Sequence, residues 1–170
     1  MVPYLTVRDA LASLAFYEQA FGFEHGETLS LPDGRPIQVV MHHAGAVAVK
    51  FSPEGICSGS MRAPATSGAE NPIVLYVPCR KVDDLTARAR AAGAAIASEP
   101  NDMFWGERIA RIVDPDGYVW CFAAKAGKFD ARKIPQVLEA IEPPKSEAQQ
   151  NQAADAQPQQ AQKPGLDFEF

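Results

Sequence analysis

The order of strand-like and helix-like segments occurs twice along the chain, and this internal repeat restricts the possible folds more than any other feature. Each half begins with a short apolar strand, which is followed by an amphipathic helix with an acidic start. A glycine ends each helix, as expected where the chain turns through a left-handed conformation. These segments are strands at 3–7 and 73–77, helices at 10–21 and 82–92, and the glycines Gly22 and Gly93.

Three further strand-like segments follow each of these glycines, so the predicted pattern is βαβββ, repeated once. The segments are 23–29, 37–43 and 46–51 in the first half, and 94–98, 108–113 and 118–123 in the second. Asp114-Pro115-Asp116-Gly117 is read as a turn without a chemical role. The fold class is therefore α+β. Because one helix cannot cover a sheet alone, two modules, from one chain or from two, should pair into one curved mixed sheet, with helices outside and a concave cavity inside.

Composition divides the chain into a folded part and a polar C-terminal part. We assign residues 1–127 to one domain, 128–142 to a docked C-terminal helix, and 143–170 to a flexible tail rich in Gln, Ala and Pro. Apolar residues alternate in the last five positions, from Leu166 to Phe170. That segment either adds to a sheet edge or stays disordered.

Charge, hydropathy and cysteine content exclude several classes of protein. The net charge is −5 and the basic residues are scattered, so no stripe exists to follow a nucleic-acid backbone. Apolar runs are far shorter than the roughly 20 residues that cross a bilayer. The three cysteines form no CxxC pair, so neither a disulfide framework nor a zinc knuckle is indicated. We expect a soluble, cytoplasmic protein that binds neither nucleic acid nor membrane.

Four motifs occur in this order along the chain: Pro3-Tyr4-Leu5-Thr6-Val7-Arg8-Asp9, Phe16-Tyr17-Glu18-Gln19-Ala20-Phe21-Gly22, Trp105-Gly106-Glu107-Arg108 and Asp114-Pro115-Asp116-Gly117-Tyr118-Val119-Trp120. Together they resemble the vicinal oxygen chelate superfamily of glyoxalases, bleomycin-resistance proteins and extradiol dioxygenases. The Pro-Tyr-Leu start and the Trp-Gly-x-Arg segment are most similar to the bleomycin-resistance and PhnB-like branch. The resemblance implies the tandem βαβββ fold, a homodimer, and a small-molecule site in the cavity.

The metal-binding positions of this superfamily do not carry suitable side chains here. Metal-dependent members hold one divalent ion through His, Gln or Glu, at positions that the resemblance places on Val2, Pro72 and Cys121. Valine and proline side chains offer no N or O donor, and one thiol does not make a site. In the fourth strand the inward candidates are read as Val47, Val49 and Phe51. We expect neither a metal nor another cofactor.

The histidines provide an alternative metal site that stays open. His42 and His43 are neighbours on a strand, so their side chains point to opposite faces and cannot both bind one ion. One of them together with His25 would be needed. Solvent-facing or hydrogen-bonded strand histidines are the favoured interpretation.

The family position assigned to Cys121 also predicts which residues line the cavity. The resemblance implies that Cys121 faces the cavity, and strand alternation then sends Trp120 and Phe122 toward the helices. Phe104 and Trp105 stand where this branch places an aromatic wall for a planar ligand. The predicted ligand-binding residues are Tyr4, Thr6, Phe104, Trp105, Glu107, Ile109, Arg111, Val119 and Cys121.

Three of these residues have alternative roles. Trp105 could pack in a dimer interface, and Arg111 could form a pair with Glu107, two residues away on the same face. Cys121 is interpreted as a small buried hydrophobic residue in preference to a nucleophile. No catalytic residue is assigned.

The favoured function is that of a metal-free homodimeric binding protein, which sequesters a small planar or charged ligand in an aromatic-lined groove. The acidic net charge favours a cationic ligand, whereas Arg111 favours an anionic group. The alternative is a lyase, isomerase or dioxygenase of the same superfamily, either metal-free or dependent on a divalent metal.

Overall fold

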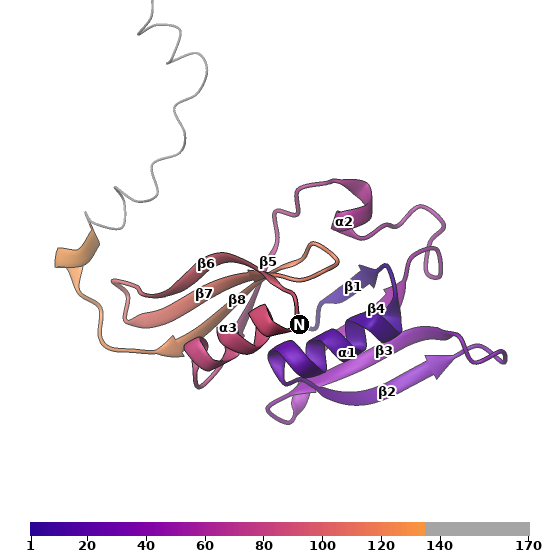
Figure 1. Ribbon diagram of the computed structural model, residues 1–170, viewed down its shortest axis with the longest axis horizontal. Helices are drawn as coiled ribbons and strands as arrows, with labels where there is room; N and C mark the ends of the chain where they lie inside the picture. The colour runs from indigo at the N-terminus through magenta and orange to yellow at the C-terminus, as the bar shows by residue number, and fades with distance from the viewer. Residues whose placement is uncertain (135–170) are drawn as a thin grey trace, which may run out of the picture. The chain divides into compact units, whose positions relative to one another are not determined.

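A computed structural model describes residues 1–134 of the chain, and a compact unit extends over Met1–Lys133 (Figure 1). Of the helix expected at 128–142, the described part holds a short 3-10 helix, η2 (Ala131–Lys133). The rest of that prediction and the expected tail at 143–170 lie outside the described residues. No helix among residues 1–134 is long and apolar enough to span a lipid bilayer.

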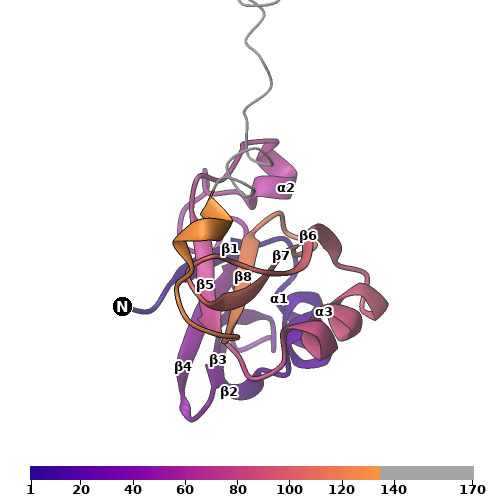
Figure 2. The same ribbon diagram turned by 90° about the vertical axis from the view of Figure 1, so that its left-hand side faces the viewer.

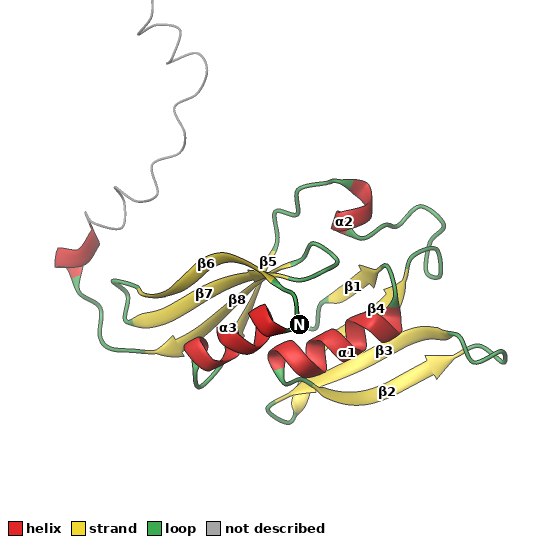
Figure 3. Cartoon of the chain, viewed as in Figure 1, coloured by secondary structure: helices red, strands yellow, loops and turns green. Residues whose placement is uncertain are grey.

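The predicted βαβββ repeat is present in both halves of this unit (Figure 3). The first module consists of β1 (Tyr4–Val7), α1 (Ala10–Phe16), the π-helix η1 (Tyr17–Phe21), β2 (Glu24–Ser30), β3 (Pro36–His43) and β4 (Ala46–Pro53). The second consists of β5 (Val74–Pro78), α3 (Val82–Ala91), β6 (Ala95–Asp102), β7 (Glu107–Val113) and β8 (Val119–Lys125). A short helix, α2 (Pro64–Ser67), which the sequence did not predict, lies between the modules.

Each module forms its own four-stranded mixed sheet, and the α+β class is thereby confirmed. Sheet A has the strand order β1-β4-β3-β2, and sheet B has the order β5-β8-β7-β6. The first strand of each module runs parallel to the last strand, and the other pairs are antiparallel. In the described residues the two sheets share no strand pair, so β1 and β5 each have one open edge. The expected single larger sheet is therefore two sheets within this unit.

One hydrophobic core joins the two modules beneath the helices. Figures 1 and 2 both show α1 and α3 side by side, and the core contains residues of both helices and both sheets. Tyr17 packs edge-on against Trp120 with ring centroids 5.4 Å apart, and Phe21 lies 4.7 Å from Phe122. The prediction that Trp120 and Phe122 face the helices is confirmed.

The predicted register of the fourth strand is wrong. Val49 and Phe51 were expected in the cavity, but both are fully buried in the core. Phe51 pairs with Leu5 of β1 and Val39 of β3, which are core residues as well. Alternation therefore turns Lys50 and Ser52 toward the opposite face of sheet A.

The Asp114–Gly117 turn has a structural role that the sequence did not reveal. The Asp116 carboxylate accepts hydrogen bonds from the Arg8 amide at 2.9 Å and the Ser13 hydroxyl at 2.6 Å, both in the first module. Asp114 accepts from the Tyr17 hydroxyl and the Trp120 indole, each at 2.8 Å. Because both aspartates are buried, these bonds fix the second module against the first.

Candidate functional site

The face of sheet B opposite the core carries most of the predicted ligand-binding residues. Ile109, Cys121 and Ala123 form a small apolar cluster of their own, against which Met103 packs. Their neighbours Ala110 and Ile112 are buried on the core side. Alternation along β7 and β8 places Glu107, Arg111 and Val119 on the same open face as that cluster.

Two hydrogen bonds hold the Glu107 carboxylate in place on this face. Its Oε2 accepts hydrogen bonds from the Tyr76 hydroxyl at 2.5 Å and from the Trp105 indole N–H at 2.8 Å. Its Oε1 has no hydrogen-bond partner among residues 1–134. Burial, followed by the hydrogen bond to Glu107 and the charge of that carboxylate, raises the pKa of Tyr76, so the phenol remains a donor.

Tyr76 is a site residue that the sequence analysis missed. It lies opposite Cys121 in the β5–β8 pairing, so its side chain falls on the open face of sheet B. The only residue of this strand region considered from sequence was Pro72. The signal was available, since Tyr76 is polar and stands at an alternate position of an otherwise apolar strand.

Arg111 and Cys121 are partners across β7 and β8. Cys121 is only 3% exposed, and burial raises the pKa of its thiol although Arg111 opposes the shift. Arg111 forms no ion pair with a carboxylate of the described part of the chain, so the alternative of an Arg111–Glu107 pair is not realised. Arg111 is exposed, and its charge is available to a ligand.

Phe104 and Trp105 form an aromatic edge beside Glu107. Their ring centroids are 4.9 Å apart in a T-shaped contact, and Phe129 lies 6.0 Å from Phe104. Trp105 is 38% exposed and Phe129 is 62% exposed. Phe129 was not predicted as a site residue, because the sequence analysis assigned it to the docked helix at 128–142 and not to the lining of the cavity.

Tyr4 and Thr6, the predicted residues of the first module, are separate from this group. The Tyr4 hydroxyl contacts the Ser52 hydroxyl and lies 3.3 Å from Gln38 Oε1 and 3.4 Å from Cys57 Sγ. Hydrogen bonds with Ser52 and Tyr4 lower the pKa of the exposed Cys57 thiol. Thr6 is buried, and its backbone exchanges hydrogen bonds with the Tyr118 hydroxyl.

A groove of about 570 Å³ runs between the open edges of β1 and β5, and Tyr4 and Tyr76 both line it. Much of the remaining lining is apolar and exposed, including Val2, Ile73 and Val74. The structure thus brings Trp105, Glu107, Ile109, Arg111, Val119 and Cys121 to one face, with Tyr4 at the groove and Thr6 in the interior.

The positions that the family resemblance assigns to a metal carry few donor side chains in this chain. Val2 and Pro72 are exposed hydrocarbon side chains, Cys121 is a buried thiol, and the corrected fourth strand presents Lys50 and Ser52. Among residues 1–134 no three His, Cys, Asp or Glu side chains gather closely enough to hold an ion. His25 and His43 are hydrogen-bonded to Thr28 and to the Pro78 carbonyl.

Comparisons with known proteins agree with this architecture. A protein of Mycobacterium tuberculosis H37Rv, described as uncharacterised, is 29% identical over 119 residues, which cover 69% of this chain and 69% of the relative. The structure of TioX from Micromonospora sp. ML1 is similar with a TM-score of 0.60 at 24% identity, over 74% of this chain and 97% of that one.

A glyoxalase/bleomycin resistance protein/dioxygenase family enzyme from Burkholderia phytofirmans PsJN gives a TM-score of 0.57 at 22% identity, over 72% of this chain and 94% of that one. The family model described as glyoxalase/bleomycin resistance protein/dioxygenase superfamily matches residues 2–122, which include both modules. The chain therefore belongs to the glyoxalase/bleomycin resistance protein/dioxygenase superfamily.

Proposed function

We propose that this chain binds a small molecule on the open face of sheet B, without a metal ion, as one subunit of a homodimer. The arrangement around Glu107 carries the proposal, because Oε2 is fixed by two donors while Oε1 has no partner in the described residues. The exposed indole of Trp105 adjoins this carboxylate. A fixed polar group beside an exposed aromatic ring is typical of sites for small planar molecules.

The ligand that fits this face is planar and carries both a hydrogen-bond donor and an acceptor. Glu107 Oε1 can accept a bond from an amino or hydroxyl group, and the Arg111 guanidinium can donate to a carbonyl or an anionic group. Glu107 and Arg111 thus place opposite charges on one face, so a cationic group and an anionic group would each find a partner there.

Binding without reaction is favoured by the protonation of the nearby groups. The raised pKa of Cys121 keeps its thiol protonated, and the raised pKa of Tyr76 keeps its phenol protonated. Neither group is then available as a nucleophile or a base at neutral pH.

A homodimer is supported by the open edges of β1 and β5. Tyr4, Ile73 and Val74 leave much of their side chains exposed along these edges. Unpaired strand edges with exposed apolar side chains are usually covered in stable proteins. A second copy that covers them would also enclose the groove beside Tyr76 and deepen the site.

A second candidate, a metal-free enzyme, is favoured by one observation, the lowered pKa of Cys57 beside Tyr4 and Ser52. A thiolate there would lie beside the Tyr4 hydroxyl, and Tyr4 lines the groove. Such an enzyme would lose activity completely when Cys57 is replaced by Ala, whereas binding on sheet B would not change.

The test is a titration of the protein with planar aromatic compounds, one set cationic and one anionic, by calorimetry and tryptophan fluorescence. We expect the fluorescence change to vanish in Trp105→Phe, because the other tryptophan, Trp120, is buried in the core. Glu107→Gln should weaken binding of cationic compounds about tenfold, as expected for one charge-assisted hydrogen bond.

Arg111→Gln should weaken binding of anionic compounds by a similar factor, and Arg35→Gln, in a hairpin of the first module, is the matched control. Sedimentation of the same preparation should give the mass of two chains, and elemental analysis should give no stoichiometric divalent metal. Unchanged affinity in both Glu107→Gln and Arg111→Gln would contradict the proposal.

A further inference from the structure

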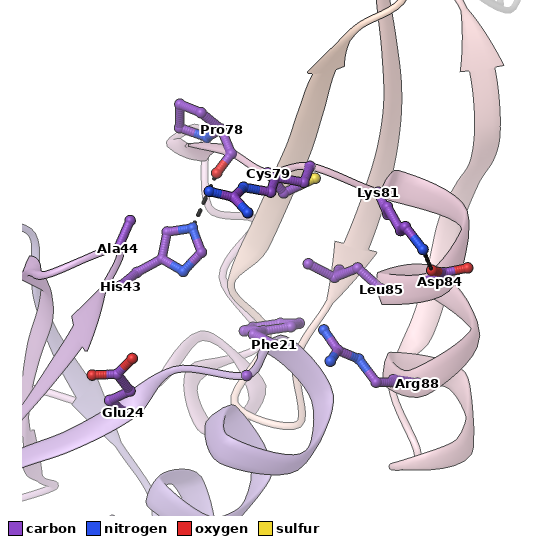
Figure 4. Close-up of a pocket in the computed structure, with 12 residues that line it drawn as sticks. Phe21, Glu24, His43, Ala44, Pro78, Cys79, Lys81, Asp84, Leu85 and Arg88 are labelled. Carbon is purple, nitrogen blue, oxygen red and sulfur yellow. Dashed lines mark hydrogen bonds and ion pairs between the residues drawn. The ribbon is translucent and has the colours of Figure 1, made fainter.

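A cleft of about 620 Å³ lies between the two modules on the helix side, away from the open face of sheet B. The first module contributes the end of η1 and the turn between β3 and β4. The second contributes the loop from β5 to α3 and one side of α3 itself. Figure 4 shows Phe21 and Leu85 at the middle of this cleft, where they provide an apolar floor. None of the predicted ligand-binding residues lines it.

The pairing of the arginines distinguishes this cleft from the rest of the surface. Six of the nine arginines form ion pairs: Arg8, Arg35, Arg62, Arg90, Arg108 and Arg132. The other three have no carboxylate partner in the described part of the chain. One is Arg111 on sheet B, and the remaining two, Arg80 and Arg88, both line this cleft. In a chain with a net charge of −5, two unpaired cations at one cavity indicate a site for an anion.

The backbone of the first module leaves room for one of these cations. The Arg88 guanidinium lies beside Gly22, where a Cβ would be in ordinary van der Waals contact with its Nη2, at 3.5 Å. Gly22 has φ 69° and ends η1, so the chain turns away at the point where Arg88 enters the cleft. On the other side, His43 is hydrogen-bonded to the Pro78 carbonyl at 3.1 Å, which joins the two walls.

The acidic residues of the cleft limit the charge of the ligand. Asp84 is neutralised by Lys81, with 3.1 Å between Nζ and Oδ2. Glu24 forms no ion pair in the described residues, and Figure 4 shows it on the first-module wall, across the cleft from Arg88. A polyanion would meet this carboxylate, so a ligand with a single anionic group fits better.

We propose that this cleft is a second ligand site, for a small organic molecule with one carboxylate or phosphate group and an apolar body. Arg80 and Arg88 bind the anionic group, and the apolar body packs on Phe21 and Leu85. Because its walls come from both modules, a bound ligand clamps the two modules together. The site is independent of the proposed binding face on sheet B.

The experiment uses phenylacetate and phenyl phosphate as probes, with benzylamine as a cationic control of similar shape, at constant ionic strength. Affinity is measured by calorimetry, and amide chemical shifts locate the site. We expect both anions to shift the amides of Gly22, Ala44 and Cys79, and benzylamine to shift none of them. The relative affinities of the two anions identify carboxylate or phosphate as the preferred group.

The variant Arg80→Gln/Arg88→Gln should bind at least about tenfold more weakly, because charge-assisted hydrogen bonds are lost. Arg90→Gln is the matched control on the same helix, since Arg90 is paired with Glu99 outside the cleft. Arg111→Gln should leave this binding unchanged, which separates it from the sheet B site. The proposal is overturned if neither anion binds, if benzylamine binds equally well, or if the double variant retains its affinity.

Discussion

At the scale of single residues, the three cysteines occupy environments that act on their thiols in opposite directions. Cys57 is exposed, and hydrogen bonds with Ser52 and Tyr4 lower its pKa. Burial raises the pKa of Cys79 and of Cys121. At a given pH the thiolate fraction grows as the pKa falls, and the thiolate is the reactive form. Position in the chain gave no hint of this difference, because it depends on which hydroxyls surround each sulfur.

We expect iodoacetamide to alkylate Cys57 first at about pH 7, with Cys79 and Cys121 reacting only as the pH is raised. Peptide mass spectrometry after timed quenching measures the three rates separately. Ser52→Ala removes the largest cause of the lowered pKa, so it should shift the onset of Cys57 alkylation to higher pH. Equal rates for Cys57 and Cys121 across the pH range would show that the environments do not differ.

The buried carboxylate of Asp114 leads to a second prediction at this scale. Its two oxygens accept four hydrogen bonds, from Tyr17, Trp120 and the amides of Asp116 and Tyr118. Asp114→Asn replaces one acceptor oxygen by an NH₂ group that faces the Trp120 N–H. The indole N–H can only donate, so two donors then face each other without an acceptor. We expect a loss of roughly 2–3 kcal/mol in unfolding free energy, the cost of buried donors left without acceptors.

Urea unfolding followed by fluorescence measures this loss for Asp114→Asn. Asp84→Asn is the control, because Asp84 is exposed and its ion pair with Lys81 should contribute less than about 0.5 kcal/mol. If both substitutions cost the same, the buried network around Asp114 is not a source of stability.

Some residues of the candidate site were predicted from the sequence and others were not, and the reason differs from residue to residue. The family resemblance places Cys121, Ile109 and Glu107 on the cavity face relative to the Asp114–Gly117 turn, and strand alternation then predicts that they share one face. Tyr76 and Phe129 were missed because their roles depend on contacts between elements. Thr6 lies on the same face of its strand as Tyr4 but is buried, because alternation gives the direction of a side chain and not what covers it.

At the scale of elements, the amphipathic helices were easier to predict than the strand registers. Leu11, Leu14 and Phe21 repeat at helical spacing, and Gly22 marks the end of that helix. In β4, by contrast, Ala46, Val47, Ala48 and Val49 are all apolar, so periodicity could not tell the core face from the open face. The pairing of Phe51 with the core residue Leu5 determines which face of β4 is buried. Such a pairing joins strands that are far apart in the sequence, so local periodicity does not contain it.

Two element ends allow a comparison of glycines. Gly117 has φ 89°, and a Cβ there would lie 2.9 Å from the Ala65 backbone nitrogen. Gly22 has φ 69°, but the nearest atom to its Cβ position is 3.5 Å away on the flexible Arg88 side chain. Gly22→Ala should therefore cost about 1 kcal/mol of stability, the strain of a left-handed alanine.

Gly117→Ala should cost more than about 2 kcal/mol, because steric overlap with the segment at α2 adds to the same strain. Thermal unfolding of both variants beside the parent protein measures the difference. A smaller effect at Gly117 than at Gly22 would mean that the contact between the Asp114–Gly117 turn and α2 is loose.

At the scale of the molecule, the repeat predicted two modules but not the side-chain contacts that join them. Periodicity describes each sheet and each helix, whereas the junction depends on side chains far apart in sequence. Tyr17 packs on Trp120, Asp116 binds Ser13, and neither pair follows any local pattern. The separation into two sheets was likewise not predictable, because edge strands with similar apolar sequences can pair or stay open.

The shared core implies that neither module is stable alone, and this is our last prediction. Separation would expose Tyr17 and Phe21 of one module and Trp120 and Phe122 of the other, all nearly or fully buried in the intact chain. Burying an aromatic side chain of this kind contributes about 1.5–3 kcal/mol, so each half would lose about twice that amount from these rings alone, which approaches the stability of a whole domain. Fragments 1–70 and 71–133 should each give poorly dispersed amide spectra and no cooperative thermal transition. Mixed together, they should recover the spectrum of the intact 1–133 segment. A cooperative transition in fragment 1–70 alone would show instead that the first module folds without the second, and that Asp116 and Trp120 join two domains already formed.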